Sequence, residues 1–238
     1  MRAHVVVLTG AGVSADSGVA TFRDAGGLWE GHRPEDVATE EAWHRDRATV
    51  WRFYQQRRAQ LRTVEPNAAH VALATFGVRC ERGAVRFTLV TQNVDDLHAR
   101  AGSVVLPMHG ELASLRCERC SRRVRDLEHV EHAKFLPCLA CGHDALRPDI
   151  VWFGEVPFFL DEIDAAMRTC THFLAIGTSG NVWPAAGLLG VARGRSAATS
   201  VQALEPPSNL SPRDRFVKGR AADQVPPMLE ELARELGI

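Results

Sequence analysis

The chain has 238 residues, of which 45% are hydrophobic and 24% are charged, as is typical of a globular protein and too apolar for a disordered one. Its 28 Lys and Arg against 29 Asp and Glu leave a formal charge of −1, so no overall field attracts nucleic acid or an anionic membrane. No apolar run approaches the roughly 20 residues that span a bilayer, and the run at residues 5–8 is too short for a signal peptide. We therefore expect a cytoplasmic protein without nucleic-acid or membrane partners.

Short apolar segments rich in β-branched residues alternate with segments of helical period, which predicts an α/β fold. The predicted strands span residues 4–9, 87–91, 104–106, 173–176 and 200–204, with a shorter candidate at 149–153. The predicted helices span residues 39–61, 67–76, 94–99, 157–170, 184–192 and 226–236. Three prolines between residues 206 and 212 predict that residues 205–220 form a long surface loop, because proline does not fit inside a sheet.

A glycine-rich turn follows the first predicted strand directly. Gly10, Gly12 and Ala15 fit the G-x-G-x-x-(G/A) spacing of turns that bring a backbone close to a pyrophosphate at a helix N-terminus, although a tight turn without a ligand shows the same spacing. An ordinary dinucleotide-binding fold also has a second strand about 20 residues on, which ends in an acidic residue that binds the ribose. No acidic residue in 26–36 ends an apolar strand. The sequence therefore predicts a nucleotide loop without the usual hydride-transfer layout, followed by a flap at residues 22–27.

Four of the six cysteines form two C-x-x-C pairs, Cys117/Cys120 and Cys138/Cys141, on either side of residues 121–137. Two such pairs at this separation match a zinc ribbon of four thiolates, whereas a redox site would need one pair that opens a helix. Four thiolates close the coordination shell, so we predict one structural zinc. The metal would order residues 116–147, which are too poor in long apolar runs to build a core of their own.

Polar side chains follow two further predicted strands, at the strand ends where open α/β sheets bind ligands. Gln92, Asn93 and Asp95 come after the strand at 87–91 and can hydrogen-bond a ribose or a carboxamide, although Asn93 or Asp95 can equally cap the next helix. His109 follows the strand at 104–106, beside a glycine. A lone histidine is more often structural, but an imidazole with a pKa of about 6.5 at a strand end is suited to take a proton from a hydroxyl. His109 is therefore the candidate general base.

Together these motifs resemble one family, the sirtuins, which are NAD-dependent protein lysine deacylases. The resemblance covers nearly the whole chain in the family's order, at residues 10–14, 17–23, 91–95, 109–110, the four cysteines, 147–155 and 177–179. It implies a Rossmann-like parallel-sheet domain made of residues 1–27, 62–113 and 146–238. It also implies a smaller domain made of a helical insertion, residues 28–61, and a zinc-ribbon insertion, residues 114–145.

The resemblance implies roles for individual residues. Asn93 and His109 would be catalytic, with His109 as the general base. The substrate peptide would pair in β-fashion with Val151, Trp152, Phe153 and Gly154. NAD would be held by the glycine loop, the flap, the polar cluster and three later segments: Gly10, Ala11, Gly12, Ser14, Phe22, Arg23, Gln92, Asn93, Asp95, Gly177, Thr178, Ser179, Ala203 and Ala221.

In this family NAD is consumed as a co-substrate. The acyl-lysine oxygen attacks the ribose carbon that carries nicotinamide, and the base then activates a ribose hydroxyl, which yields free lysine, nicotinamide and O-acyl-ADP-ribose. Such chemistry needs one base and a pocket that excludes water, and it needs no catalytic metal. Two positions depart from the family's pattern. Ala20 stands where proline is usual, and Ala203 stands where asparagine is common and offers no side-chain hydrogen bond to the adenosine ribose.

One pair of residues bears on the acyl group. Tyr54, the only tyrosine of the chain, and Arg57 lie at i and i+3 of a predicted helix, so their side chains are neighbours. A phenol and a guanidinium together suit a carboxylate at the end of an acyl chain. They match the Tyr-x-x-Arg pair of the desuccinylase and demalonylase branch, which implies removal of succinyl and malonyl as well as acetyl groups. A solvated basic helix face that contains Arg57 is the alternative.

Two other functions fit an NAD pocket, a protein ADP-ribosyltransferase and a non-enzymatic NAD or ADP-ribose sensor. Asn93, Asp95 and His109 argue against the sensor, which would have no use for a base. The expected partners are therefore acyl-lysine proteins or peptides, which the sequence does not identify further. The short segment ahead of the first strand favours a monomer.

Overall fold

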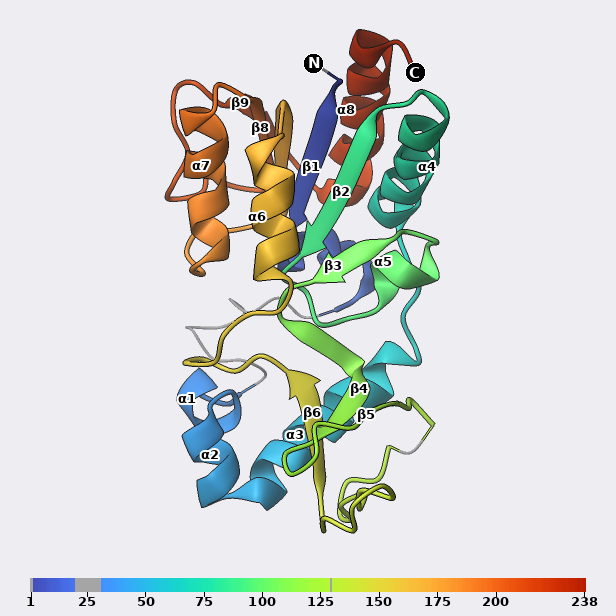
Figure 1. Ribbon diagram of the computed structural model, residues 1–238, viewed down its shortest axis with the longest axis vertical. Coiled ribbons are helices and arrows are strands. Elements are labelled where there is room, and N and C mark those ends of the chain that lie inside the picture. The colour runs from blue at the N-terminus through green and yellow to red at the C-terminus, as the bar shows by residue number, and fades with distance from the viewer. Residues whose placement is uncertain (1, 20–30, 129) are drawn as a thin grey trace.

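The computed structural model describes residues 2–19, 31–128 and 130–238. Within these ranges it contains a six-stranded parallel sheet and a separate three-stranded antiparallel sheet, which confirms the predicted α/β class with a smaller second part. Figure 1 shows the two parts one above the other, with helix α8 and the start of strand β1 at the end of the larger part that lies far from the smaller one.

The larger sheet has the strand order of a Rossmann-like fold. In spatial order its strands are β3 (Val105–Pro107), β2 (Arg86–Thr91), β1 (His4–Thr9), β7 (His172–Ile176), β8 (Ala198–Ala203) and β9 (Arg215–Lys218). Strand β1 is buried along its whole length because it pairs with β2 on one side and β7 on the other, which is why its sequence is continuously apolar. The chain builds outward from β1 in both directions, so the carboxyl ends of the strands beside β1 border a crevice.

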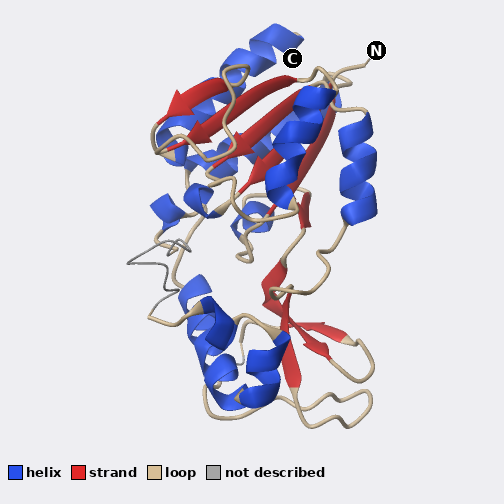
Figure 2. Ribbon diagram, turned by 90° about the vertical axis from the view of Figure 1, so that its left-hand side faces the viewer, coloured by secondary structure: helices blue, strands red, loops and turns tan. Residues whose placement is uncertain are grey.

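Helices cover both faces of this sheet. Helices α4 (Ala68–Arg82) and α8 (Ala221–Leu236) share one apolar core with it, and α6 (Leu160–Arg168) and α7 (Leu188–Gly194) share another. Figures 1 and 2 show the two groups on opposite sides of the strands, with the short helix α5 (Leu97–Arg100) after β2. Among the described residues, none of the helices combines the length and the apolar character needed to cross a bilayer.

The smaller part packs helices against the antiparallel sheet. Its helices are α1 (Pro34–Val37), α2 (Glu40–Arg45) and α3 (Arg47–Leu61), and its strands in spatial order are β5 (Arg123–Arg125), β4 (Gly110–Cys117) and β6 (Leu146–Ile150). Figure 2 shows the helices beside this small sheet. One apolar core joins them, in which Trp43 and Trp51 of the helices meet Leu115 and Cys117 of β4. The cysteine-containing segment therefore shares a core with the helical insertion.

Two sequence predictions in the smaller part are corrected by the structure. Residues 39–61 form two helices because the chain breaks at Asp46, whose φ of −148° and ψ of 76° are not helical. The Asp46 carboxylate accepts a hydrogen bond from the Thr49 N–H at 3.1 Å and so caps α3. The candidate strand at 149–153 is wrong in extent: it lies at Leu146–Ile150 as β6, and it pairs with β4 of the small sheet.

The loop predicted at residues 205–220 is wrong in its last part. Strand β9 forms there and pairs in parallel with β8 at the edge of the large sheet, for example Phe216 with Val201. The three prolines all precede β9, so they remove none of its N–H groups. The last helix begins at Ala221 instead of at Pro226, and two prolines therefore lie in its second turn.

Candidate active site

The carboxyl ends of neighbouring parallel strands meet at the edge of the large sheet that faces the smaller part. Gly10 follows β1, Gln92 follows β2, His109 lies just beyond β3, Gly177 follows β7 and Ala203 ends β8. A cavity of about 740 Å³ opens at this edge and is lined by residues of both parts. This volume lies in the range of pockets that enclose small-molecule ligands and cofactors.

Every predicted site residue that the structure describes lies in this cavity wall, apart from the four cysteines. Phe22 and Arg23, and also Ala20, lie outside the described residues. The predicted nucleotide-binding residues that line the cavity are Gly10, Ala11, Gly12, Ser14, Gln92, Asn93, Asp95, Gly177, Thr178, Ser179, Ala203 and Ala221. The predicted substrate-binding residues that line it, together with His109, are Tyr54, Arg57, Val151, Trp152, Phe153 and Gly154.

The glycine loop packs directly against the loop that follows β7. The Gly12 N–H donates to the Gly177 carbonyl at 2.9 Å, and a Cβ on Gly12 would lie 2.8 Å from the Gly177 Cα, so a side chain does not fit. The loop continues in two 3₁₀ turns, Ala11–Val13 and Ala15–Ser17, where glycine-rich turns of this spacing usually lead into an α-helix. The N–H groups of Gly10, Gly12, Val13 and Ser14 all donate to carbonyls within the protein, so these bonds hold the turn in shape at the cavity wall.

A buried hydrogen-bond network fixes the polar cluster behind the loop. The Asn67 N–H donates to His70 Nδ1 at 3.2 Å, so Nε2 carries the ring proton and donates to the Ser14 hydroxyl at 3.3 Å. The same hydroxyl oxygen accepts from Asn93 Nδ2 at 3.0 Å, and Ser14 also hydrogen-bonds the Asp95 carboxyl. Sequence reasoning missed His70, although the spacing Asn-x-x-His of a helix start was a usable signal.

The sequence left open whether Asn93 or Asp95 caps the helix that follows, and in the structure the contact belongs to Asp95. Its Oδ1 accepts from the Leu97 N–H at 3.2 Å, at the start of α5. Burial raises the pKa of Asp95, while the hydrogen bonds from Ser14 and Leu97 oppose that rise. Asn93 instead directs its amide nitrogen at Ser14.

His109 is oriented by a backbone carbonyl. Its Nδ1 lies 2.9 Å from the Gln92 oxygen, and because a carbonyl only accepts, Nδ1 carries the ring proton and Nε2 keeps its lone pair. Burial lowers the pKa of His109 below its usual 6.5, and the hydrogen bond to Gln92 partly opposes this. The ring is therefore neutral at neutral pH, with an accepting nitrogen, as a general base requires.

The lowered pKa of His109 predicts the acid limb of the activity. Protonation would occupy the Nε2 lone pair, so kcat/KM should fall as the pH drops through the lowered pKa, with the midpoint of the fall below pH 6.5. The measurement is a pH profile of kcat/KM for an acyl-lysine peptide, with thermal melting at each pH as the control for unfolding. A limb centred above pH 6.5 in folded protein would contradict this assignment.

The four cysteines lie together at the end of the small sheet, where Cys117 is the last residue of β4. Their sulfur atoms are all within 4.8 Å of one another, with 3.6 Å between Cys117 and Cys141 and 3.6 Å between Cys120 and Cys138. A tetrahedral zinc with Zn–S bonds of about 2.3 Å sets its sulfurs about 3.8 Å apart, so the donor set fits this ion. Four protein ligands fill the coordination shell, which makes the site structural.

Tyr54 and Arg57 reach the cavity from helix α3. Tyr54 is fully buried and Arg57 is only 4% exposed, which excludes a solvated basic face for Arg57. The Arg57 guanidinium carbon lies 5.5 Å from the centre of the Phe53 ring. Burial raises the pKa of Tyr54, and the nearby Arg57 charge opposes this without cancelling it, so the hydroxyl stays protonated and able to donate.

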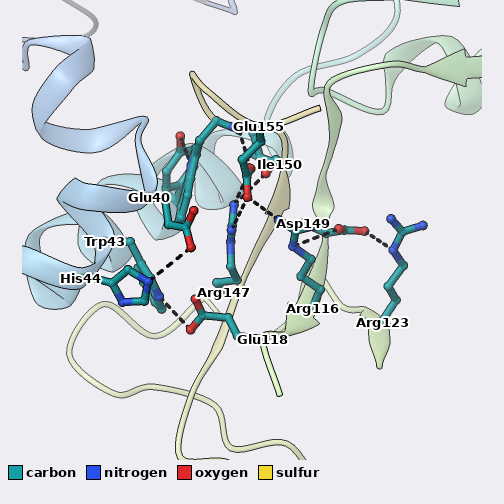
Figure 3. Close-up of polar contacts among 12 residues, drawn as sticks. Glu40, Trp43, His44, Arg116, Glu118, Arg123, Arg147, Asp149, Ile150 and Glu155 are labelled. Carbon is teal, nitrogen blue, oxygen red and sulfur yellow. Dashed lines mark hydrogen bonds and ion pairs between the residues drawn. The ribbon is translucent and has the colours of Figure 1, made fainter. Parts of the chain in front are cut away.

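Two residues without a predicted role hold the segment after β6. Arg147 donates to both Glu155 oxygens, at 2.7 and 3.0 Å, and Figure 3 shows the two side chains aimed at each other. Glu155 also accepts from the Trp152 N–H at 2.7 Å. Burial tends to raise the pKa of Glu155, but the hydrogen bonds from Arg147 and Trp152 lower it. The opposite charges of Arg147 and Glu155 at the two ends of the segment 147–155 were the signal for this pair.

Comparisons with known proteins agree with this geometry. A model of the Sir2 family matches residues 10–184. The NAD-dependent protein deacylase SIR2rp3 of Trypanosoma brucei brucei is 46% identical over 237 residues, which cover 98% of this chain and 96% of that protein. An NAD-dependent protein deacylase of Shewanella oneidensis is 45% identical over 235 residues, 98% of this chain and 95% of that one. A solved complex of a Sir2 homologue with NAD superposes with a TM-score of 0.87 at 34% identity and covers 99% of this chain and 91% of its own.

Proposed function

The chain belongs to the Sir2 family and is an NAD-dependent protein deacylase, and we propose that it prefers lysines whose acyl chain ends in a carboxylate, such as succinyl and malonyl, while also accepting acetyl. The observation that carries this preference is the burial of Tyr54 and Arg57 side by side in the cavity wall. Both groups donate hydrogen bonds, and a carboxylate offers only acceptors. A charge-assisted pair of this kind recognises a carboxylate in both charge and shape.

The nucleotide side of the cavity supports binding of NAD, which supplies the ribose carbon that is attacked and the nicotinamide that leaves. The close approach of Gly12 to Gly177 leaves main chain and no side chain where a pyrophosphate would lie. Asn93 and Asp95, held by Ser14, would bind the nicotinamide and its ribose. Ala203 would lie against the adenosine, where the backbone has to provide the polar contacts.

His109 would act as the general base. Its Nε2 lone pair lies on the ring edge opposite Gln92, because Nδ1 donates to the Gln92 carbonyl. When Nε2 takes a proton from a ribose hydroxyl, the ring becomes positively charged, and that same carbonyl stabilises the charge. The Gln92 main chain is fixed in turn, because its N–H donates to the Thr9 carbonyl at 2.9 Å. The base therefore needs little reorganisation during the reaction.

The segment from Val151 to Gly154 would bind the backbone of the substrate. It lies at the cavity wall directly after β6, and Phe153 remains 51% exposed. The N–H groups of Val151, Trp152 and Phe153 donate to His109, Glu155 and Ala38 within the protein. The Trp152 carbonyl already accepts from the Glu155 N–H at 3.0 Å, so a peptide in β-fashion would use the Val151 and Phe153 carbonyls.

The function is tested by incubating the protein with NAD and peptides of one sequence that carry succinyl-lysine or acetyl-lysine. We expect free lysine, nicotinamide and O-acyl-ADP-ribose, identified by mass spectrometry, with a higher kcat/KM for the succinyl peptide. ADP-ribosylated protein in place of deacylated peptide would point to the transferase alternative. NAD binding without turnover would point to the sensor.

Replacing Arg57 by methionine should abolish desuccinylation while much of the deacetylation remains. The variant buries a similar volume but leaves the acyl carboxylate without its charged donor, which costs on the order of 1.5–3 kcal/mol or more than tenfold in kcat/KM. The measurement is kcat/KM for the matched succinyl and acetyl peptides. Arg52→Met, an exposed position on the same helix, is the control and should leave the ratio of the two activities unchanged. An equal fall of both activities in Arg57→Met would remove Arg57 from acyl selection.

A further inference from the structure

The Tyr54 hydroxyl has a hydrogen-bond donor of its own inside the core. Trp152 Nε1 donates to the Tyr54 oxygen at 3.0 Å, and both side chains are buried. A hydroxyl oxygen that accepts from an indole N–H must turn its own hydrogen away from that indole. The direction in which Tyr54 donates is therefore set by Trp152, a residue far from it in the sequence.

The indole is itself held firmly. The Arg147 guanidinium carbon lies 3.4 Å from the centre of one indole ring face, and Arg147 is fixed by its paired hydrogen bonds to Glu155 (Figure 3). The Trp152 main-chain N–H donates to the same Glu155 carboxylate. The Trp43 ring packs against the indole at a centroid distance of 5.9 Å. Rotating the indole N–H away from Tyr54 would break these contacts, so the donor is preorganised.

We propose that Trp152 is a positioning residue for acyl selection: its indole N–H occupies the accepting side of the Tyr54 hydroxyl, so that Tyr54 meets the acyl chain as a donor. This role rests on the proposed preference for acyl chains that end in a carboxylate. Arg57 can only donate, so the pair of Tyr54 and Arg57 offers donors to the acyl chain. It therefore suits a carboxylate and disfavours the matching terminal amide, whose NH₂ group would be buried without an acceptor.

The test is Trp152→Phe, which keeps an aromatic ring and removes the N–H. Without that donor, the Tyr54 oxygen can accept a hydrogen bond from the acyl chain. We expect the ratio of desuccinylation to deacetylation in kcat/KM to fall about tenfold, mainly through KM for the succinyl peptide. Discrimination between a succinyl-lysine peptide and the corresponding terminal-amide peptide should shrink as well. An unchanged ratio would overturn the proposal.

Trp43→Phe is the matched control. Trp43 is a buried indole that packs against Trp152 in the same core, but its N–H donates to Glu118 at 2.9 Å and not to Tyr54. Both substitutions remove one indole N–H from one cluster, so general loosening of the core should affect both variants. We expect the acyl ratio of Trp43→Phe to stay within about twofold of the unsubstituted protein. Equal changes in the two variants would count against a specific role of Trp152.

A double substitution separates an action through Tyr54 from any other effect. In a Tyr54→Phe background the hydroxyl is absent, so adding Trp152→Phe should lower the acyl ratio no further. A second full tenfold loss in that background would show that Trp152 acts by another route. This comparison needs only the residual deacylation of folded variants, checked by their thermal melting.

A spectroscopic readout does not depend on turnover. Tyr54 is the only tyrosine, so labelling with 3-fluorotyrosine places a single ¹⁹F signal at this site. Its resonance should move in Trp152→Phe and on addition of a succinyl-lysine peptide, and should move much less in Trp43→Phe. A ¹⁹F resonance that does not move in Trp152→Phe would contradict the proposed contact.

The failure of this role and of the proposed function are distinguishable. A protein that deacetylates but never removes succinyl groups would overturn the acyl preference. A protein that desuccinylates well, with a ratio unaltered by Trp152→Phe, would overturn the role of Trp152 alone.

Discussion

His109→Tyr should lose deacylation by a factor of about 10²–10⁴ or more, the contribution expected of a general base. Tyrosine keeps a planar ring, but its pKa of about 10 leaves it without an accepting lone pair suited to take a proton at neutral pH. The loss should appear in kcat, because the base acts on bound reactants. It is measured as deacylated peptide formed per enzyme, and appreciable residual deacylation would remove His109 from this role.

Two controls make the result specific. His44→Tyr changes a histidine on α2 whose side chain is 52% exposed, and it should retain full activity. Calorimetry should show that His109→Tyr still binds NAD, because the glycine loop does not depend on the imidazole. The base is needed only after nicotinamide has left. His109→Tyr should therefore still exchange labelled nicotinamide into NAD although it no longer deacylates the peptide.

Cys138→Ser should release the metal and unfold the ribbon segment. A structural zinc contributes on the order of 10–16 kcal/mol of apparent binding free energy, and one lost thiolate opens the coordination shell. We expect one zinc per unsubstituted chain by elemental analysis, less than one in the variant, a lower melting temperature and new protease cleavage between residues 117 and 146. Cys80→Ala, which alters a buried thiol in the core of the large sheet, should retain the zinc.

The loss of zinc should also weaken binding of the acyl peptide in the pocket. Cys117 and Cys138 share a core with Trp43 and Trp51, and the Trp51 indole donates to the Glu131 carbonyl of the ribbon segment at 2.8 Å. Trp51 and Tyr54 lie on the same helix, α3. KM for the acyl peptide should therefore rise more than KM for NAD. A metal-free protein with unchanged melting and unchanged KM values would show that the ribbon does not support the pocket.

Features that depend on residues close together in the chain could be predicted from the sequence. The continuous apolar run of β1, the Gly10–Gly12 turn and the two C-x-x-C pairs each define their geometry within a few residues. Parallel strands bring their carboxyl ends to one edge, so the strand ends alone indicated where Gln92 and His109 would lie together. The i, i+3 spacing of Tyr54 and Arg57 likewise placed both on one wall of the cavity.

Element boundaries failed where a partner decides the structure. Residues 215–218 form a strand because they pair with the edge of β8. Their own four residues are too short a signal to predict a strand directly after a proline-rich loop. Strand β4 was missed because its polar and apolar residues do not alternate regularly, and β5 because it has only three exposed residues; their pairing supplies the order instead. The helical break at Asp46 depends on a cap that competes with helix continuation.

By itself, the sequence determined which side chains are available: a glycine loop, a candidate base, a set of four thiols and a phenol beside a guanidinium. Only the tertiary structure decided how those groups are oriented. The Gln92 carbonyl sets which nitrogen of His109 accepts, and Trp152, 98 residues from Tyr54, sets the direction in which that hydroxyl donates. The physical reason is that burial and hydrogen-bond direction depend on the neighbours that folding brings together, whereas the type of side chain is fixed before the chain folds.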